Sequence, residues 1–195
     1  TKNKILNGKE QLDIIAPIMG SRLQLISASC FDEKRNWRKK ISTTLTQAYL
    51  KHPFGKEILN IILPIINNKN ITKLKDLNIL IIKNICDYLN IDNSLEIDSI
   101  YNFHGEKSLK IKNICNYFKC QNLLSPIGSK KYIEEEGIIK KSNINVFYLE
   151  KNLNVKYLQY KNIGFNDDIS IIDIIANIGP VEALDFIERK FKLNK

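Results

Sequence analysis

Three stretches in the first half of the chain repeat apolar residues every three to four positions, as amphipathic helices do. The first runs from Trp37 to Lys51 and is ended by Pro53. The second covers Lys56–Ile66, and the third opens at Thr72. The third carries one stripe that predicts a buried face: Leu74, Leu77, Ile81, Ile85, Tyr88 and Leu89.

Shorter patterns indicate strands before these helices. Leu12–Ile18 is largely apolar, and Arg22–Ser27 alternates polar and apolar residues. Met19–Ser21 can turn between the two, so we expect a pair of strands here. A short extended piece is expected at Leu95–Ile97.

In the second half of the chain, helical and strand patterns alternate in short units. They are Glu106–Lys119 (helix), Asn122–Ile127 (strand), Lys131–Lys141 (helix) and Ile144–Leu149 (strand). This alternation predicts an α/β fold, rich in helices, with a mostly parallel sheet covered by helices. Right-handed crossovers would place the loop Ser125–Lys130 at the sheet edge where such folds bind ligands.

The last third of the chain predicts a strand and two helices. The strand is Lys156–Tyr160, and the helices are Ile169–Ile178 and Val181–Lys190. Gly179 and Pro180 separate the helices in the order expected for a helix stop and a helix start. Because the chain shows neither an internal repeat nor a linker, we expect residues 1–195 to form a single domain.

Length and composition exclude several classes of protein. With 195 residues, 44% of them hydrophobic, the chain is not intrinsically disordered and needs no metal or disulfide staple. No apolar run reaches the roughly 18–20 residues of a membrane span. Four cysteines are few for an exported disulfide protein, which favours a cytoplasmic location. Cys115 and Cys120 lack the further ligands of a zinc site, so no metal is expected. The chain opens on Thr1, so we expect an incomplete N-terminus.

The formal net charge of +9 attracts anions, including nucleotide-linked substrates. Nearly all of the positive charge is lysine, which lacks the bidentate fork of arginine, and it is spread along the chain. We therefore expect a small-molecule partner. An RNA- or DNA-binding module is the less favoured alternative, and it would require the lysines to cluster on one continuous face.

The strand-to-helix loop at residues 125–132 is one candidate binding site. Gly128 allows backbone N–H groups to approach a ligand, and the helix N-terminus that follows favours an anion. Ser129 and Tyr132 add hydroxyl groups. The alternative is an ordinary turn with a glycine for tightness, since no P-loop or dinucleotide motif is present.

A second candidate site surrounds Asp173. Ser170 and Asp173 have the spacing of a helix capping box, which is the structural alternative to a catalytic carboxylate. Asn177 lies one turn beyond Asp173 on the same helix face. Tyr157 and Gln159, two apart on the expected strand, point to one side.

Two isolated residues complete the candidates. His104, in a loop before a helix, is a possible catalytic base. Trp37, the single tryptophan, either anchors its helix in the core or offers a platform on which a sugar or base stacks. No G-x-S-x-G sequence is present, which disfavours a serine hydrolase of the common α/β type.

Through most of its length the chain resembles the WbqC-like proteins of bacterial O-antigen and other surface-polysaccharide gene clusters. The family normally opens on a Gln-Pro-x-Tyr-x-Pro segment that would precede this chain, and Pro126 stands where the family has a Ser-Gly pair. The matching pieces, in order, are Asn3–Gly8, Ala16–Ile18, Trp37–Lys39, Ala48-Tyr49, His52–Phe54, Gly105–Ser108, Ile114-Cys115, Leu124–Ser129, Tyr132, Tyr157-x-Gln159, Phe165, Ser170–Asp173 and Asn177-x-Gly179.

The resemblance implies an enzyme that transfers an aminoacyl (glycyl) or acyl group to the amine of a nucleotide-linked amino sugar. Asp173 would orient or deprotonate the amine, Tyr157 and Gln159 would hold sugar hydroxyls, and the Gly128 and Ser129 amides would bind phosphate or an oxyanion. The loop and the Asp173 group would then line a common hollow. No cofactor is required beyond an activated aminoacyl or acyl donor, and the oligomeric state stays open. The alternative is a non-catalytic sugar-nucleotide-binding or scaffold protein.

Overall fold

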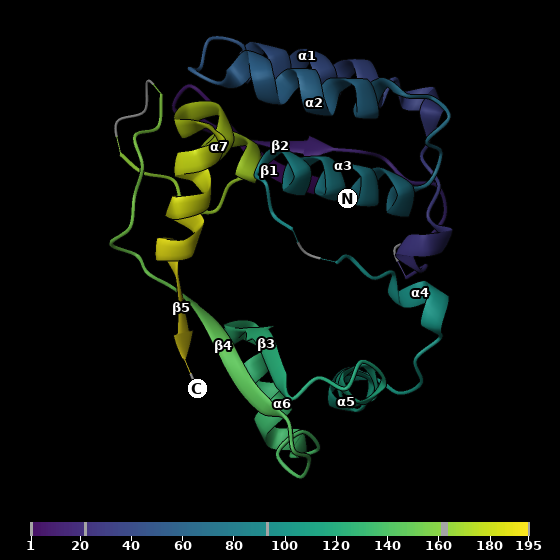
Figure 1. Ribbon diagram of the computed structural model, residues 1–195. Coiled ribbons are helices and arrows are strands. Elements are labelled where there is room, and N and C mark those ends of the chain that lie inside the picture. Colours follow the sequence, from purple (N-terminus) through teal and green to yellow (C-terminus); the bar gives the residue numbers. More distant parts are fainter. Residues whose placement is uncertain (1, 22, 93, 161–163, 195) are drawn as a thin grey trace. The chain divides into compact units, whose positions relative to one another are not determined.

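The chain folds into two compact units (Figure 1). The computed structural model describes residues 2–21, 23–92, 94–160 and 164–194. Unit 1 comprises Thr1–Ser94 and Lys156–Phe186, and unit 2 comprises Leu95–Val155 and Ile187–Lys195. Each unit therefore combines two separate segments of the chain, and each is described by itself below. The expectation of a single domain stays a prediction.

Unit 1 begins with an antiparallel hairpin of β1 (Lys2–Asn7) and β2 (Glu10–Ile15), in which Ile5 lies opposite Leu12. Gly8 adopts a φ of +64° in the two-residue turn, a conformation that glycine adopts without strain. The predicted strand at residues 12–18 is therefore found in part. It begins earlier and ends at Ile15, shortly before Pro17, which has no N–H to donate to a neighbouring strand.

The predicted strand at Arg22–Ser27 is wrong for residues 23–27; Arg22 lies outside the described residues. This segment forms bends and the 3-10 helix η1 (Ile26–Ala28). Its backbone is held locally, since the Leu23 N–H donates to the Ser21 hydroxyl and the Gln24 amide donates to the Met19 carbonyl. Such local bonds compete with a strand ladder, and Leu23 is 95% exposed rather than facing a core.

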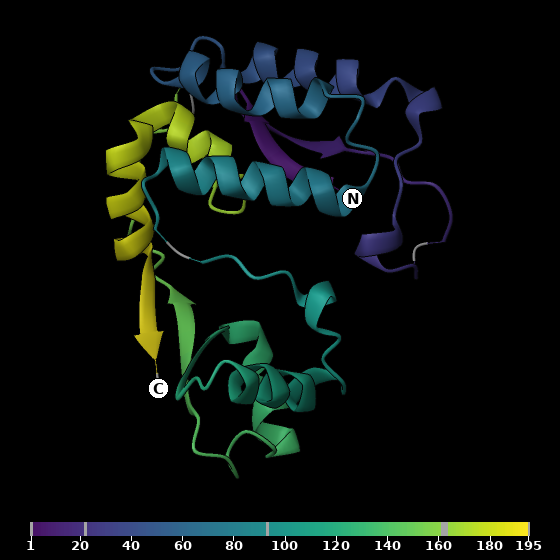
Figure 2. The ribbon, with the colours of Figure 1, turned by 45° about the vertical axis from the view of Figure 1, so that its right-hand side comes forward.

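Three helices follow, as predicted: α1 (Trp37–Tyr49), α2 (Gly55–Asn67) and α3 (Leu74–Tyr88). A short 3-10 helix, η2 (Glu33–Arg35), precedes them. Helix α1 packs against both α2 and the hairpin, and α2 packs against α3 (Figures 1 and 2). Their apolar faces meet in the core of unit 1, where these side chains are fully buried: Ile5, Leu45, Tyr49, Ile58, Ile62 and Ile175.

A buried arginine ties α1 to the end of α2. The Arg38 guanidinium donates to the carbonyls of Ile66, Asn68 and Ile71 at 2.6–2.9 Å. It also forms an ion pair with Glu33 at 2.7 Å. The last carbonyls of a helix have no partner within that helix, so this fork satisfies groups that would otherwise be buried unpaired.

Helix α7 (Ile171–Lys190) is broken at Gly179, as the sequence predicts. Gly179 has φ +77° and ψ 178°, and Pro180 starts the second segment; Figure 2 shows the change of direction. A Cβ at residue 179 would lie 2.7 Å from the ring of Phe54, so only glycine fits here. The neighbouring contact from the Phe54 N–H to the Ala176 carbonyl fixes α7 to the start of α2.

Unit 2 contains a three-stranded sheet and short helices. Strands β3 (Asn122–Pro126) and β4 (Asn145–Lys151) are parallel, and β5 (Phe191–Asn194) pairs antiparallel with β4. The helices are α4 (Asp98–Tyr101), α5 (Lys107–Tyr117) and α6 (Lys130–Glu136), with the 3-10 helix η3 (Ile127–Ser129) before α6. A small core forms around Ile133, Ile139 and Tyr148.

The prediction of a helix-rich fold is confirmed, but that of a mostly parallel sheet is not. The β3–α6–β4 crossover is parallel as expected, whereas β1–β2 is an antiparallel hairpin and β5 runs antiparallel to β4. The helix–strand alternation predicted for residues 106–149 is found, except that the helix expected at Lys131–Lys141 ends at Glu136, where Gly137 adopts a φ of +61°. The tight β1–β2 turn, by contrast, permits only antiparallel pairing. Lys156–Tyr160, predicted to be a strand, does not form one. Ile97, the last residue of the short extended piece expected at Leu95–Ile97, has an extended backbone with φ −100° and ψ 104°.

Candidate functional site

The structure gathers three of the predicted site residues around the buried carboxylate of a fourth, Asp173, in unit 1. The Tyr157 hydroxyl donates to Oδ2 of Asp173 at 2.6 Å. The side-chain amides of Asn177 and Gln159 lie 3.2 and 3.3 Å from the same oxygen. Asp173 is 1% exposed, and Gln159 and Asn177 are also buried. We call these four side chains, together with Tyr49, the Asp173 cluster.

The second carboxylate oxygen of Asp173 differs from the first. Oδ1 is buried and makes no hydrogen bond of ordinary length to any described residue. A buried oxygen left without a donor is uncommon in folded proteins. Asp173 therefore presents one satisfied oxygen and one that can still accept a hydrogen bond.

Burial raises the pKa of the Asp173 carboxyl, while the nearby donor groups of Tyr157, Tyr49 and Gln159 act in the opposite direction. Burial and the Asp173 charge also raise the pKa values of Tyr49 and Tyr157. Both phenols thus stay protonated and can donate. Catalytic acids and bases are often carboxyl groups of this kind, which lie beside fixed hydrogen-bond donors and whose proton affinity is raised by burial.

The capping-box alternative is only half present. The Ser170 hydroxyl accepts from the Ile172 N–H at 3.4 Å, as a helix cap does. In a complete capping box, the Asp173 side chain would also accept from the Ser170 N–H. That contact is missing, because the Ser170 N–H donates to the Lys4 carbonyl instead. Asp173 thus turns away from the cap and toward Tyr157.

Side-chain contacts replace a strand ladder at Tyr157–Tyr160 and at Asn166. The Gln159 amide donates to the Asn166 carbonyl, and its oxygen accepts from the Asn166 N–H. The Tyr160 N–H donates to the Asn177 side chain at 2.6 Å. Tyr157 and Gln159 therefore point to one side as predicted, although the segment is not a strand.

The predicted loop site lies in unit 2, apart from the Asp173 cluster along the chain. The Ser129 hydroxyl is buried, lies 2.6 Å from the Ser125 hydroxyl and donates to the Pro126 carbonyl. Gly128 is exposed, its φ is not positive, and a Cβ there would meet nothing within 4 Å. Tyr132 packs beside the small core of unit 2. The expected common hollow of loop and carboxylate stays a prediction.

The two isolated candidates lie away from the cluster along the chain. His104 is an exposed loop residue of unit 2, and its carbonyl accepts from the Asn113 amide. Trp37 is only 2% exposed, its ring stands 4.6 Å from Phe31, and the Arg38 guanidinium lies 4.4 Å from its ring centre. The ring anchors α1 in unit 1.

Two important residues were not recognised in the sequence. Tyr49 places its phenol beside Asp173 and accepts from the Leu6 N–H, but in the sequence it is one member of an apolar helical stripe. Arg38 stands in a basic run at the start of α1, and nothing in that run distinguishes a buried arginine from a solvated one.

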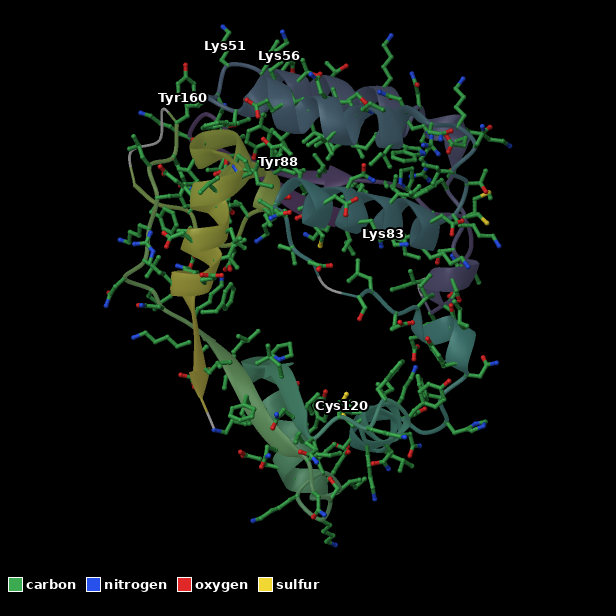
Figure 3. All side chains as sticks on the ribbon, in the orientation of Figure 1. Lys51, Lys56, Lys83, Tyr88, Cys120 and Tyr160 are labelled. Atoms are coloured by element: carbon green, nitrogen blue, oxygen red, sulfur yellow. The ribbon has the colours of Figure 1, made fainter. Side chains whose placement is uncertain are left out.

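Two further kinds of feature are absent from the described residues. They contain no cluster of His, Cys, Asp or Glu side chains suited to a metal ion. None of their helices combines the length and apolar character needed to cross a membrane. Among the lysines labelled in Figure 3, Lys51 lies between α1 and α2, Lys56 lies in the first turn of α2, and Lys83 lies on α3.

The comparison with protein families tests the family resemblance that the sequence motifs suggested. A model of the WbqC-like protein family matches residues 1–184, which include the whole Asp173 cluster. The chain belongs to the WbqC-like family. No curated protein and no solved structure gives a significant match to it. The WbqC-like match ends within the second segment of α7, before β5.

Proposed function

We propose that this WbqC-like protein acts in the cytoplasm in the biosynthesis of surface polysaccharides. The reaction is the transfer of an aminoacyl (glycyl) or acyl group from an activated donor to the amine of a nucleotide-linked amino sugar. Membership of the family supports the biosynthetic setting. The residues around Asp173 support the chemical role.

One observation carries the catalytic role: Asp173 is a buried carboxylate with one oxygen held by fixed donors and the other without a partner among the described residues. Amide formation needs a proton acceptor of this kind beside the reacting nitrogen, because the ammonium form of an amine has no lone pair to attack with. A raised pKa brings the carboxyl closer to the neutral range, where a base is most effective.

In the proposed step, the amine nitrogen attacks the carbonyl carbon of an ester or thioester donor and forms the new C–N bond. Oδ1 of Asp173 takes the proton that the nitrogen loses, and the C–O or C–S bond of the donor breaks. The proton then passes to the departing alkoxide or thiolate, which leaves Asp173 ionised again. Tyr157 and Asn177 keep the carboxylate in place throughout.

The test uses Asp173→Asn, which keeps the shape of the side chain but removes the base. The purified protein is given nucleotide-linked amino sugars with glycyl or acyl donors, and the new amide is detected by mass spectrometry. We expect turnover to fall about a hundredfold or more, as for the loss of a general base. Asp87→Asn, on the exposed surface of α3, is the matched control and should leave turnover unchanged. Equal turnover in both variants would refute the role of Asp173.

A second function is favoured by a different observation. Asp173 is 1% exposed and three donors surround its Oδ2, an arrangement that also suits a purely structural group. The chain would then be a non-catalytic sugar-nucleotide-binding or scaffold protein. Retained binding of the nucleotide sugar, measured by a raised melting temperature, without amide formation from any donor would establish this function instead.

A further inference from the structure

Unit 1 contains a cavity of about 400 Å³ that the Asp173 chemistry does not use. Isoleucine and leucine side chains of α1, α2 and α3 form most of its wall, with Trp37 among them. Native cores rarely hold voids larger than a single water molecule. A volume of this size lies within the roughly 300–1,000 Å³ of small-molecule sites.

The wall changes character from the inside outward. Leu45 and Ile62 are completely buried and mark its deep end. Asn3, Asn78 and Ile82 are exposed and mark its mouth. Lys2 also reaches the mouth, where it forms an ion pair with Asp13 at 2.9 Å. A ligand that suits this gradient has a long apolar part and a polar end.

We infer that this cavity binds the hydrocarbon chain of an acyl group, with the polar end of that group at the mouth. An aliphatic wall takes up a flexible chain by burying apolar surface, which is favourable in proportion to the area buried. The amides of Asn3 and Asn78 can donate to carbonyl or carboxylate oxygens at the mouth.

The cavity also meets the start of α7. Ser170, Ile171 and Ile172 contribute to its wall and immediately precede Asp173 in the chain. The binding of an acyl chain to the cavity does not depend on the proposed transfer. If that transfer occurs, such binding indicates an acyl donor rather than a glycyl donor. Binding and turnover are therefore measured separately.

Trp37 provides a direct probe, because it is the single tryptophan and lines the cavity. Its fluorescence is followed as ω-bromoundecanoate is added below its micelle concentration, since bromine quenches an indole only at contact. We expect saturable quenching by this acid and little quenching by iodide, which cannot reach a ring that is 2% exposed. Quenching that rises without saturation would overturn the inference.

Two neighbouring substitutions on α3 test the location. Ile81→Phe places a larger side chain in the cavity wall, whereas Leu80→Phe makes a similar change outside the wall. We expect the first to weaken binding at least about tenfold relative to the second. Circular dichroism melts confirm that both variants fold. Ile81→Ala enlarges the cavity, and its affinity should shift toward longer acids. Equal affinity in all three variants would place the acid elsewhere.

Asp173→Asn separates this inference from the proposed function. The variant should bind ω-bromoundecanoate like the unaltered protein, because Asp173 is not part of the cavity wall. Binding retained without turnover in Asp173→Asn would support both proposals. Turnover without saturable quenching in the unaltered protein would refute the cavity alone.

Discussion

The phenolic oxygen of Tyr157 lies 2.6 Å from Oδ2 of Asp173, although Tyr157 precedes Asp173 by sixteen positions in the chain. The contact joins an irregular segment to the first turns of α7 and fixes a buried carboxylate in one orientation. It is the shortest of the three contacts to that oxygen. The stability of unit 1 and the proton affinity of Asp173 should therefore both respond to Tyr157.

Tyr157→Phe should lower the free energy of unfolding by about 1–3 kcal/mol, the usual cost of leaving a buried polar group without its partner. The measurement is equilibrium denaturation by urea. Tyr132→Phe is the control, since the Tyr132 hydroxyl makes no hydrogen bond to any of the described residues, and it should stay within about 0.5 kcal/mol of the unaltered protein. Equal losses in both variants would contradict the role of the Tyr157 contact.

The raised pKa of Asp173 makes stability depend on pH in a defined direction. Because the folded state holds the proton more tightly than the unfolded state, the contribution of Asp173 is complete below the unfolded pKa of about 4. That contribution is lost as the pH rises through the folded pKa. The unfolding free energy of the unaltered protein minus that of Asp173→Asn should therefore decrease from acid toward neutral pH. Urea denaturation at a series of pH values gives this difference, and an increase toward neutral pH would show that the pKa is lowered instead.

Gly179→Ala should destabilise the protein strongly, because a φ of +77° and the ring of Phe54 at 2.7 Å both oppose a Cβ. We expect a loss of about 2–4 kcal/mol in denaturation experiments. Two controls separate the causes. Gly137 has a φ of +61°, but a Cβ there would meet no atom within 4 Å, so Gly137→Ala should cost about 1 kcal/mol. Gly128→Ala has neither feature and should be close to neutral. The same loss at all three positions would contradict this explanation.

Arg38→Lys should cost about 2–4 kcal/mol, because a lysine cannot reproduce the fork that contacts Glu33, the Ile66 carbonyl at the end of α2 and the Ile71 carbonyl beyond it. Arg35→Lys is the matched change at an exposed ion pair with Asp32 and should cost at most about 1 kcal/mol. Thermal and urea unfolding of both variants measure the difference. Comparable values would mean that the Arg38 contacts contribute no more than a surface pair.

The four thiols should react at different rates with a thiol reagent under native conditions. Cys120 is exposed and should react first. Cys115 is buried, and burial raises the pKa of its thiol, so it should react only after unfolding. Mass spectrometry of the partly labelled protein identifies the order. Early labelling of Cys115 would show that α5 opens readily.

Local patterns predicted much of this molecule. The stripes of α1, α2 and α3 and the break at Gly179 follow from helix periodicity and from backbone preferences that act within a few residues. The four-residue spacing of Asp173 and Asn177 likewise predicts that both side chains share one helix face, and there they are in contact. The same local reasoning was wrong at residues 22–27, where short-range hydrogen bonds replace a strand in the described part.

The amino-acid sequence by itself therefore determined the helices, the helix break and the polar character of the residues around Asp173. Only the tertiary structure decided the antiparallel pairing of β4 with β5, the burial of Arg38, and the approach of Tyr49 and Tyr157 to one carboxylate. The physical reason is the separation along the chain between the groups that interact. A helix satisfies its backbone within four residues, whereas strand pairing and the burial of a charge depend on partners that are distant in the chain.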